Sequence, residues 1–186
     1  GGLGFANLTA RSGKVRIDRD KFQNPDWQRH DRIGFNYRMS ELTGAVALAQ
    51  TERIVELVDL RIAAGNGYRD LLAKSELLRP QKLPAGEVNS CFTFAARFEG
   101  LEQDIAWDAF RMAFIKNGGD GIYACWQLIG EEPAMADKGI GWGETPVAKK
   151  LQRRIMQFTS NQRNAEEREV QQNALRQTLN EFGDTV

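Results

Sequence analysis

The sequence predicts an α+β fold, in which a long helix precedes a small domain with a short, mainly antiparallel sheet and helices on one face. Three observations predict it. Apolar residues recur at helical spacing from Leu42 to Ile62. A stretch marked by Pro and Gly, residues 79–90, follows this helix. The remaining residues then alternate between strand-like and helix-like patterns, which is the order expected of a compact α+β domain.

The long helix is predicted to begin at Ser40 or Met39, with Glu41 in its first turn, and Ser40 is a favourable capping residue. Small residues near its start, such as Gly44 and Ala45, would let another backbone approach closely. Gly65-Asn66-Gly67 interrupts the pattern. Because each Gly costs roughly 1 kcal/mol in a helix interior, we expect the helix to kink there, or to end and restart.

The chain is predicted to have three consecutive parts, which are an irregular segment over 1–32, a long interface helix over 33–78 and a small α+β domain over 79–186. A short strand is possible at 14–18, and an ordered surface loop is expected at 21–31. In the small domain, we expect strands at 90–98, 121–128 and 155–160, helices at 104–119, 145–154 and 164–182, and a loop at 131–144.

Several helix ends have recognisable signals. Asn164 is a plausible cap for the last helix, Gly183 follows it, and Pro146 opens the short helix before it. Gly118-Gly119 resembles a phosphate-binding turn at a glance, but its spacing fits no known fingerprint. We therefore interpret this pair as the end of a helix.

The composition excludes several classes of protein. Of 186 residues, 41% are hydrophobic and 27% are charged, and the net charge is zero, so nothing indicates nucleic-acid binding. No apolar run approaches the length of a membrane span, and a cytoplasmic protein is expected. One histidine excludes a multi-histidine metal site, and Cys91 and Cys125 are predicted to be reduced thiols. The chain begins Gly-Gly rather than with Met, which indicates a piece of a longer protein.

Asn36, Tyr37 and Arg38 stand immediately before the long helix. An amide donor and a guanidinium fork suit a phosphate or a carboxylate, and the helix N-terminus adds free N–H groups. The alternative is purely structural. In that case Asn36 caps the helix, Tyr37 packs in the core and Arg38 makes a surface ion pair.

The segment GFNYRMSELTGAVALAQTERIVELVDLR, which begins at residue 34, resembles a long motif of the DegT/DnrJ/EryC1/StrS family. These are sugar aminotransferases that depend on pyridoxal 5'-phosphate (PLP) and have the aspartate-aminotransferase fold, PLP transferase type I. The order of the later strands and helices also suits the small C-terminal domain of that family. The resemblance implies a homodimer with shared active sites, acting on an amino acid, with glutamate expected, and on a nucleotide-linked keto sugar.

The resemblance also implies roles for particular residues. Asn36 would contact the phosphate of the partner subunit's PLP, and Tyr37 and Arg38 would line the same region. His30 is similar in position to family residues near the nucleotide-sugar substrate. From their chemistry alone, Tyr123, Trp126 and Gln127 could face a sugar, although packing in a strand core is the favoured interpretation for Trp126. Lys149, Lys150, Arg153 and Arg154 form a basic cluster, which is either a solvated face or a diphosphate contact.

The sequence departs from the family in one important respect. The lysine that forms the Schiff base with PLP lies upstream of this motif in the family, and neither Lys14 nor Lys21 has its Gly-rich context. No catalytic residue is therefore assigned in this chain, which we expect to be an inactive C-terminal fragment with an exposed apolar face. Two alternatives stay open. One is a non-catalytic helical interaction module, and the other is a PLP-dependent sugar dehydratase, in which a histidine replaces the lysine.

Overall fold

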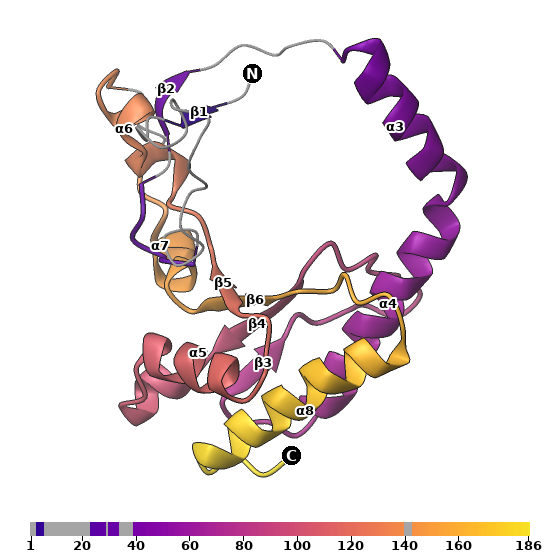
Figure 1. The fold of residues 1–186 in the computed structure, drawn as a ribbon. Helices are drawn as coiled ribbons and strands as arrows, with labels where there is room; N and C mark the ends of the chain where they lie inside the picture. The colour runs from indigo at the N-terminus through magenta and orange to yellow at the C-terminus, as the bar shows by residue number, and fades with distance from the viewer. Residues whose placement is uncertain (1–2, 6–22, 29, 34–38, 140–142) are drawn as a thin grey trace. The chain divides into compact units, whose positions relative to one another are not determined.

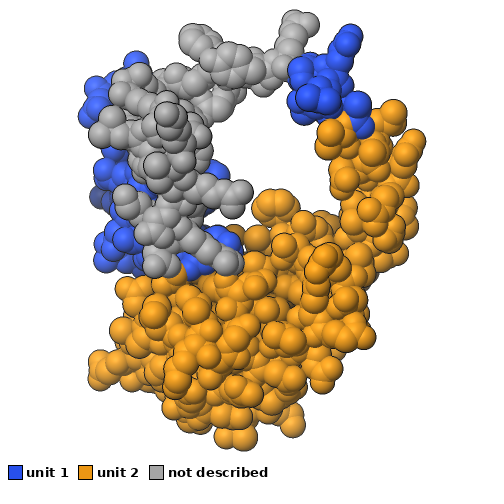
Figure 2. All heavy atoms as spheres, in the orientation of Figure 1, with its two compact units in different colours: residues 1–45, 123–153 blue, residues 46–122, 154–186 orange. Residues whose placement is uncertain are grey.

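The computed structural model describes residues 3–5, 23–28, 30–33, 39–139 and 143–186 (Figure 1). Contacts divide the chain into two compact units, shown in Figure 2. Unit 1 holds residues 1–45 and 123–153, and unit 2 holds residues 46–122 and 154–186. Each unit therefore combines two separate stretches of sequence. The division into three consecutive parts stays a prediction.

The main sheet has four strands in the order β3-β4-β6-β5. The strands are β3 (Leu78–Pro80), β4 (Phe94–Phe98), β5 (Ile122–Ala124) and β6 (Ile155–Phe158). β3 pairs with β4, and β4 with β6, in antiparallel fashion. This confirms the predicted short, mainly antiparallel sheet. β3 was not expected, since it lies at the start of the Pro-marked stretch, but Pro80 is tolerated because β3 is an edge strand.

Three helices pack on one face of this sheet and form the core with it (Figure 1). They are α4 (Ile54–Leu71), α5 (Trp107–Lys116) and α8 (Ala165–Glu181), while a short 3-10 helix, η1 (Gly100–Gln103), links β4 to α5. The inward side chains of β4 alternate with outward ones, as a strand with one buried face requires. Aromatic rings make the contacts between Tyr68 and Phe94, Phe114 and Phe158, and Phe98 and Phe110, with centroids 5.2, 5.6 and 5.2 Å apart.

The predicted long helix is two helices, α3 (Glu41–Glu52) and α4, which meet at Arg53. The expectation that the helix ends and restarts at Gly65-Asn66-Gly67 is wrong, because α4 runs through these residues. A Cβ at Gly65 would lie 2.2 Å from Sγ of Cys91, and one at Gly67 would lie 2.1 Å from Nε2 of Gln172. These glycines therefore allow close packing against the helix, which outweighs their poor helix propensity.

α3 begins where the sequence predicts, since Oγ of Ser40 accepts a 3.3 Å hydrogen bond from the backbone N–H of Thr43. None of its residues is buried. Its apolar side chains face solvent, with Leu42 79% and Val46 58% exposed. The exposed apolar face expected from the sequence is therefore present on this helix.

Unit 1 contains two short strands, β1 (Leu3–Phe5) and β2 (His30–Ile33), which pair in antiparallel fashion. Sequence patterns predict irregular structure there, because strands of three or four residues are too short to show a period. The expected strand at 14–18 lies outside the described residues. The stretch expected to be a loop, 131–144, contains α6 (Pro133–Ala136), which follows the short 3-10 helix η2 (Ile129–Glu131) and packs against β2. α7 (Pro146–Gln152) completes the unit.

The predicted helix ends are confirmed. Oδ1 of Asn164 accepts a 2.9 Å hydrogen bond from the N–H of Glu167, which caps α8. Gly118 has a φ of +94°, and the N–H of Gly119 donates to the carbonyl of Phe114, so this pair closes α5. In the described part of the chain, no helix is both long enough and apolar enough to cross a bilayer.

Candidate functional site

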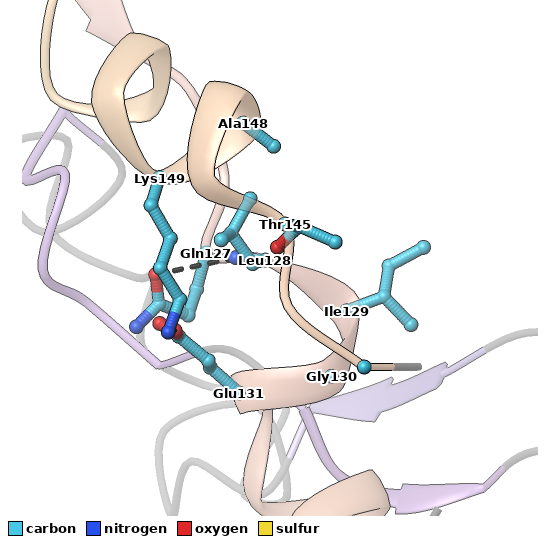
Figure 3. Close-up of a pocket in the computed structure, with 9 residues that line it drawn as sticks. Gln127, Leu128, Ile129, Gly130, Glu131, Thr145, Ala148 and Lys149 are labelled. Carbon is cyan, nitrogen blue, oxygen red and sulfur yellow. Dashed lines mark hydrogen bonds and ion pairs between the residues drawn. The ribbon is translucent and has the colours of Figure 1, made fainter. Parts of the chain in front are cut away.

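A pocket of about 480 Å³ lies within unit 1, between the segment that follows β5 and the start of α7 (Figure 3). This volume falls in the range of small-molecule sites. Its lining residues are Gln127, Leu128, Ile129, Gly130, Glu131, Gly143, Thr145, Ala148 and Lys149. The pocket combines an apolar wall with a few polar groups, which is the usual composition of a site for a small organic ligand.

Local sequence signals position the two sides of this pocket. Pro146 fixes the first turn of α7, and Thr145 stands immediately before it without making a side-chain cap. The Thr145 hydroxyl is therefore not used to begin the helix. Across the pocket, the η2 turn presents Leu128 and Ile129, and Ile129 is 61% exposed. The pocket lining therefore contains both apolar side chains and a hydroxyl group.

Glu131 and Lys149 provide the charges of the pocket. Nζ of Lys149 lies 3.0 Å from Oε1 of Glu131, and Figure 3 shows the two side chains pointing toward one another. The Lys149 side chain is 60% exposed and that of Glu131 is 40% exposed. An exposed pair of this kind contributes little to stability, about 0–1 kcal/mol. Both charges remain accessible to a polar ligand.

Three members of the basic cluster, Lys149, Arg153 and Arg154, make ion pairs. Besides Lys149, NH2 of Arg153 lies 3.1 Å from Oδ1 of Asp26. NH1 of Arg154 lies 2.8 Å from Oε1 of Glu102 and 3.3 Å from Oε2 of Glu99. The solvated interpretation fits Lys149 and Arg153, whereas the side chain of Arg154 is only 19% exposed. These acidic partners do not favour a diphosphate contact.

The residues predicted to contact PLP, Asn36, Tyr37 and Arg38, lie outside the described residues. His30 is in β2, where the backbone pairs with Phe5. β2 packs against α6, and α6 also contacts η2, the turn that carries Glu131. The strand of His30 and one wall of the pocket are therefore neighbours within unit 1.

Tyr123 and Trp126 precede the pocket on the same segment. Tyr123 is half-buried in β5. Trp126 is 59% exposed, so the favoured interpretation that it packs in a strand core is wrong. The reason is that β5 ends at Ala124, two residues before Trp126. Neither side chain lines the pocket, and their predicted contact with a sugar stays a prediction.

Sequence reasoning did not single out Thr145 or Glu131. A Thr-Pro pair at a helix start was the available signal for Thr145. No sequence pattern indicated a role for Glu131, because its pairing with Lys149 depends on the contact of two segments that are separate in sequence. The two thiols are free, and burial raises the pKa of both Cys91 and Cys125. The described residues contain no cluster of three or more side chains suited to a metal ion.

The pocket does not suit the reactive end of PLP. A lysine that bonds covalently to this cofactor needs an amine that is available to react, whereas Nζ of Lys149 is engaged in the 3.0 Å ion pair with Glu131. The Glu131 carboxylate would repel the cofactor's phosphate.

The fold is that of aminotransferases, as the solved structures show. PseC of Helicobacter pylori, an aminotransferase involved in pseudoaminic acid biosynthesis, has a TM-score of 0.65 at 15% identity, covering 94% of this chain and 45% of its own. For the putative sugar aminotransferase Spr1654 of Streptococcus pneumoniae, in its PMP form, the TM-score is 0.63 at 16% identity, with coverage of 89% and 42%. TlmJ of Streptoalloteichus hindustanus has a TM-score of 0.60 at 19% identity, with coverage of 84% and 42%.

The sequence itself matches the model of the DegT/DnrJ/EryC1/StrS aminotransferase family over residues 11–172. The chain belongs to this family, as its motif at residues 34–50 indicates. No curated protein matches it. The chain spans less than half the length of the solved structures named above.

Proposed function

We propose that this chain is part of a PLP-dependent aminotransferase that transfers an amino group from an amino acid, with glutamate as donor, to a nucleotide-linked keto sugar. The family match over residues 11–172 carries the proposal, since it includes the Asn36-Tyr37-Arg38 motif. The similarity to Spr1654, a putative sugar aminotransferase, and to PseC, an aminotransferase involved in the biosynthesis of pseudoaminic acid, supports a sugar as the acceptor.

PLP, when bound, supplies the electron sink that amino-group transfer requires. In the proposed homodimer, Asn36 of this chain holds the cofactor phosphate of the partner subunit, and Tyr37 and Arg38 line the same region. Amide and guanidinium donors suit that task. The lysine that bonds to the cofactor belongs to the part of the protein that this chain lacks, so this chain alone is inactive.

The pocket of unit 1 is the proposed contact for the sugar. A sugar ring has apolar C–H faces and hydroxyl edges. Leu128 and Ile129 suit the faces, and the Thr145 hydroxyl and the Glu131–Lys149 pair suit the edges. His30, Tyr123 and Trp126 are proposed to contribute to the same substrate region.

The exposed face of α3 supports association with a further part of the enzyme. Leu48 is 62% exposed, and Met39, which precedes the helix, is 64% exposed, in addition to the apolar residues described above. Exposed apolar surface of this kind marks a protein interface. We propose that this helix is buried at the interface of the complete homodimer.

The first experiment measures PLP binding by the full-length protein that contains this chain. Cofactor absorbance is recorded for the wild type, for Asn36→Ala and for Asn66→Ala, which alters an exposed asparagine of α4. Loss of one phosphate contact should weaken binding by about 10- to 100-fold, whereas Asn66→Ala should leave it unchanged. Absence of PLP binding in the full-length dimer would overturn the proposal in favour of the interaction module.

A second measurement separates the aminotransferase from a dehydratase on the same fold. The full-length protein is incubated with glutamate and a nucleotide-linked keto sugar, and 2-oxoglutarate is measured. An aminotransferase forms 2-oxoglutarate and the amino sugar in equal amounts. A protein that binds PLP, lacks the lysine and forms no 2-oxoglutarate would instead be the dehydratase.

A further inference from the structure

Unit 1 has a second pocket, of about 480 Å³, beside the turn at residues 24–28. The described residues that line this pocket, which we call the Trp27 pocket, are Asn24, Asp26, Trp27 and Gln28. None of them lines the pocket between η2 and α7. The lining therefore places one indole ring among two carboxamides and a carboxylate.

The turn that carries these side chains is fixed by its own hydrogen bonds. Oδ1 of Asn24 accepts a 2.8 Å hydrogen bond from the backbone N–H of Asp26. The backbone N–H of Trp27 donates a 3.3 Å hydrogen bond to the carbonyl oxygen of Asn24. Asparagine favours turns because its side chain can accept from a backbone N–H two residues on. The direction of the chain at Trp27 is therefore set locally.

The end of α7 holds the same turn from the other side. Gln152 is only 7% exposed, and its Nε2 donates a 2.9 Å hydrogen bond to the carbonyl oxygen of Pro25. Leaving a buried donor without its acceptor costs about 1–3 kcal/mol, so this contact ties the turn to the helix. NH2 of Arg153 lies 3.1 Å from Oδ1 of Asp26 and adds a second connection. The Trp27 pocket is therefore formed before any ligand binds, which lowers the entropic cost of binding.

Trp27 supplies the apolar surface of this pocket. It is half-buried, and it contributes to the pocket lining. A tryptophan side chain combines a large, flat apolar ring with little conformational freedom. A flat ring on a fixed turn is suited to stack against one face of a ligand ring.

The polar side chains around Trp27 offer both donors and acceptors. Because the turn uses Oδ1 of Asn24, the Nδ2 group of that amide is directed to donate. The Asp26 side chain is 64% exposed and accepts hydrogen bonds. Gln28 is exposed, and its amide makes no hydrogen bond within the described ranges of the chain. This mixture suits hydroxyl groups, because each hydroxyl both donates and accepts.

We propose that the Trp27 pocket binds a saccharide, with one face of the sugar ring stacked on Trp27 and the ring hydroxyls bonded to Asn24, Asp26 and Gln28. A sugar ring has an apolar C–H face and a polar edge, which matches this lining. A nucleobase can also stack on an indole, but its edge has fixed donors and acceptors. The exposed amide of Gln28 can turn, so it better suits hydroxyls. Saccharide binding here requires neither PLP nor amino-group transfer, and it therefore stands apart from the proposed function.

The test is a saturation-transfer NMR titration of the full-length protein. The saccharide probes are the methyl glycosides of glucose, galactose, mannose and N-acetylglucosamine, and uridine is the nucleobase probe. The pocket variants are Trp27→Leu, Trp27→Phe and Gln28→Ala. Gln103→Ala is the control for Gln28→Ala, because it removes an exposed amide in η1, outside the pocket.

Saturable binding of at least one glycoside is expected. Trp27→Leu should weaken it by about tenfold or more, whereas Trp27→Phe keeps an aromatic face and should weaken it by less than about threefold. Gln28→Ala should weaken it by about three- to tenfold, and Gln103→Ala should leave it unchanged.

The absence of saturable binding by all the glycosides would overturn the proposal, as would tighter binding of uridine that depends on Trp27. Glycoside binding that Lys149→Met weakens and Trp27→Leu does not would also overturn it, because the sugar would then occupy the other pocket of unit 1. If circular dichroism shows that Trp27→Leu does not fold, Gln28→Ala and the preference for glycosides over uridine decide the question. PLP absorbance and 2-oxoglutarate formation are measured separately, so failure of the aminotransferase proposal is distinguished from failure of this one.

Discussion

The Ser75 hydroxyl donates a 2.6 Å hydrogen bond to Oδ2 of Asp184. The backbone N–H groups of Glu76 and Leu77 donate to the same carboxylate, at 3.2 and 3.0 Å. Ser75 is fully buried and Asp184 is 8% exposed. One carboxylate therefore connects the segment after α4 to the segment after α8, and it satisfies buried donors that would otherwise have no partner.

Asp184→Ala should lower the free energy of unfolding by about 2–4 kcal/mol, because it leaves several buried donors unpaired. Asp59→Asn, an exposed change in α4, should alter it by less than about 0.5 kcal/mol. Urea unfolding of both variants measures the difference. Equal stability of the two variants would show that the Asp184 contacts contribute nothing.

The glycines of α4 should respond differently to alanine. Gly65→Ala meets the buried side chain of Cys91 and should destabilise the protein by about 1–3 kcal/mol. Gly67→Ala meets the flexible end of Gln172, which can move, so the gain in helix propensity should nearly offset the strain. Gly44→Ala in α3, whose nearest neighbour would be 3.9 Å away, should stabilise by about 0.5–1 kcal/mol.

Thermal unfolding of these three variants checks the order of stability. Gly65→Ala should unfold at the lowest temperature and Gly44→Ala at the highest. If Gly65→Ala were as stable as Gly44→Ala, close packing at Cys91 would not explain why α4 tolerates its glycines.

Tyr68 should make the protein less stable at high pH. Burial raises the pKa of its phenol above the ordinary value of 10. Above that value the unfolded chain loses the phenol proton while the folded chain keeps it, so stability falls as pH rises toward the folded pKa. Tyr68→Phe should remove the part of the decrease in stability at high pH that comes from this phenol.

Urea unfolding of wild type and Tyr68→Phe at pH 8 and at higher pH checks this prediction. The difference in unfolding free energy between the two proteins should shift in favour of Tyr68→Phe as the pH rises above 10. A difference that does not vary with pH would mean that Tyr68 titrates alike in the folded and unfolded states.

Lys149→Met should affect binding more than stability, if the pocket of unit 1 contacts the sugar. An exposed ion pair contributes about 0–1 kcal/mol, so unfolding should change little. The KM for the nucleotide sugar should rise several-fold with kcat nearly unchanged, because a binding contact is lost. Steady-state kinetics of the full-length enzyme measures both constants.

Lys150→Met is the matched control, because Lys150 is an exposed neighbour that does not line the pocket. It should leave the KM for the nucleotide sugar at the wild-type value. An equal rise in KM for the two variants would point to a general effect of charge on this helix, and it would remove Lys149 from the substrate site.

The sequence alone determined those features that depend on neighbouring residues. The start of α8 at Asn164 and the end of α5 at Gly118 follow from capping groups within a few positions. The family follows from a contiguous motif that begins at Gly34. Such signals are readable because the interacting groups are close together along the chain.

Only the tertiary structure decided the features that depend on distant residues. α4 continues through Gly65 because Cys91, far away in sequence, packs against that glycine. Trp126 is exposed because β5 ends before it, at the point set by pairing in the sheet. The pair of Glu131 and Lys149 likewise exists because two segments meet. Packing energies of this kind exceed local propensities of about 1 kcal/mol or less, and a linear pattern does not contain them.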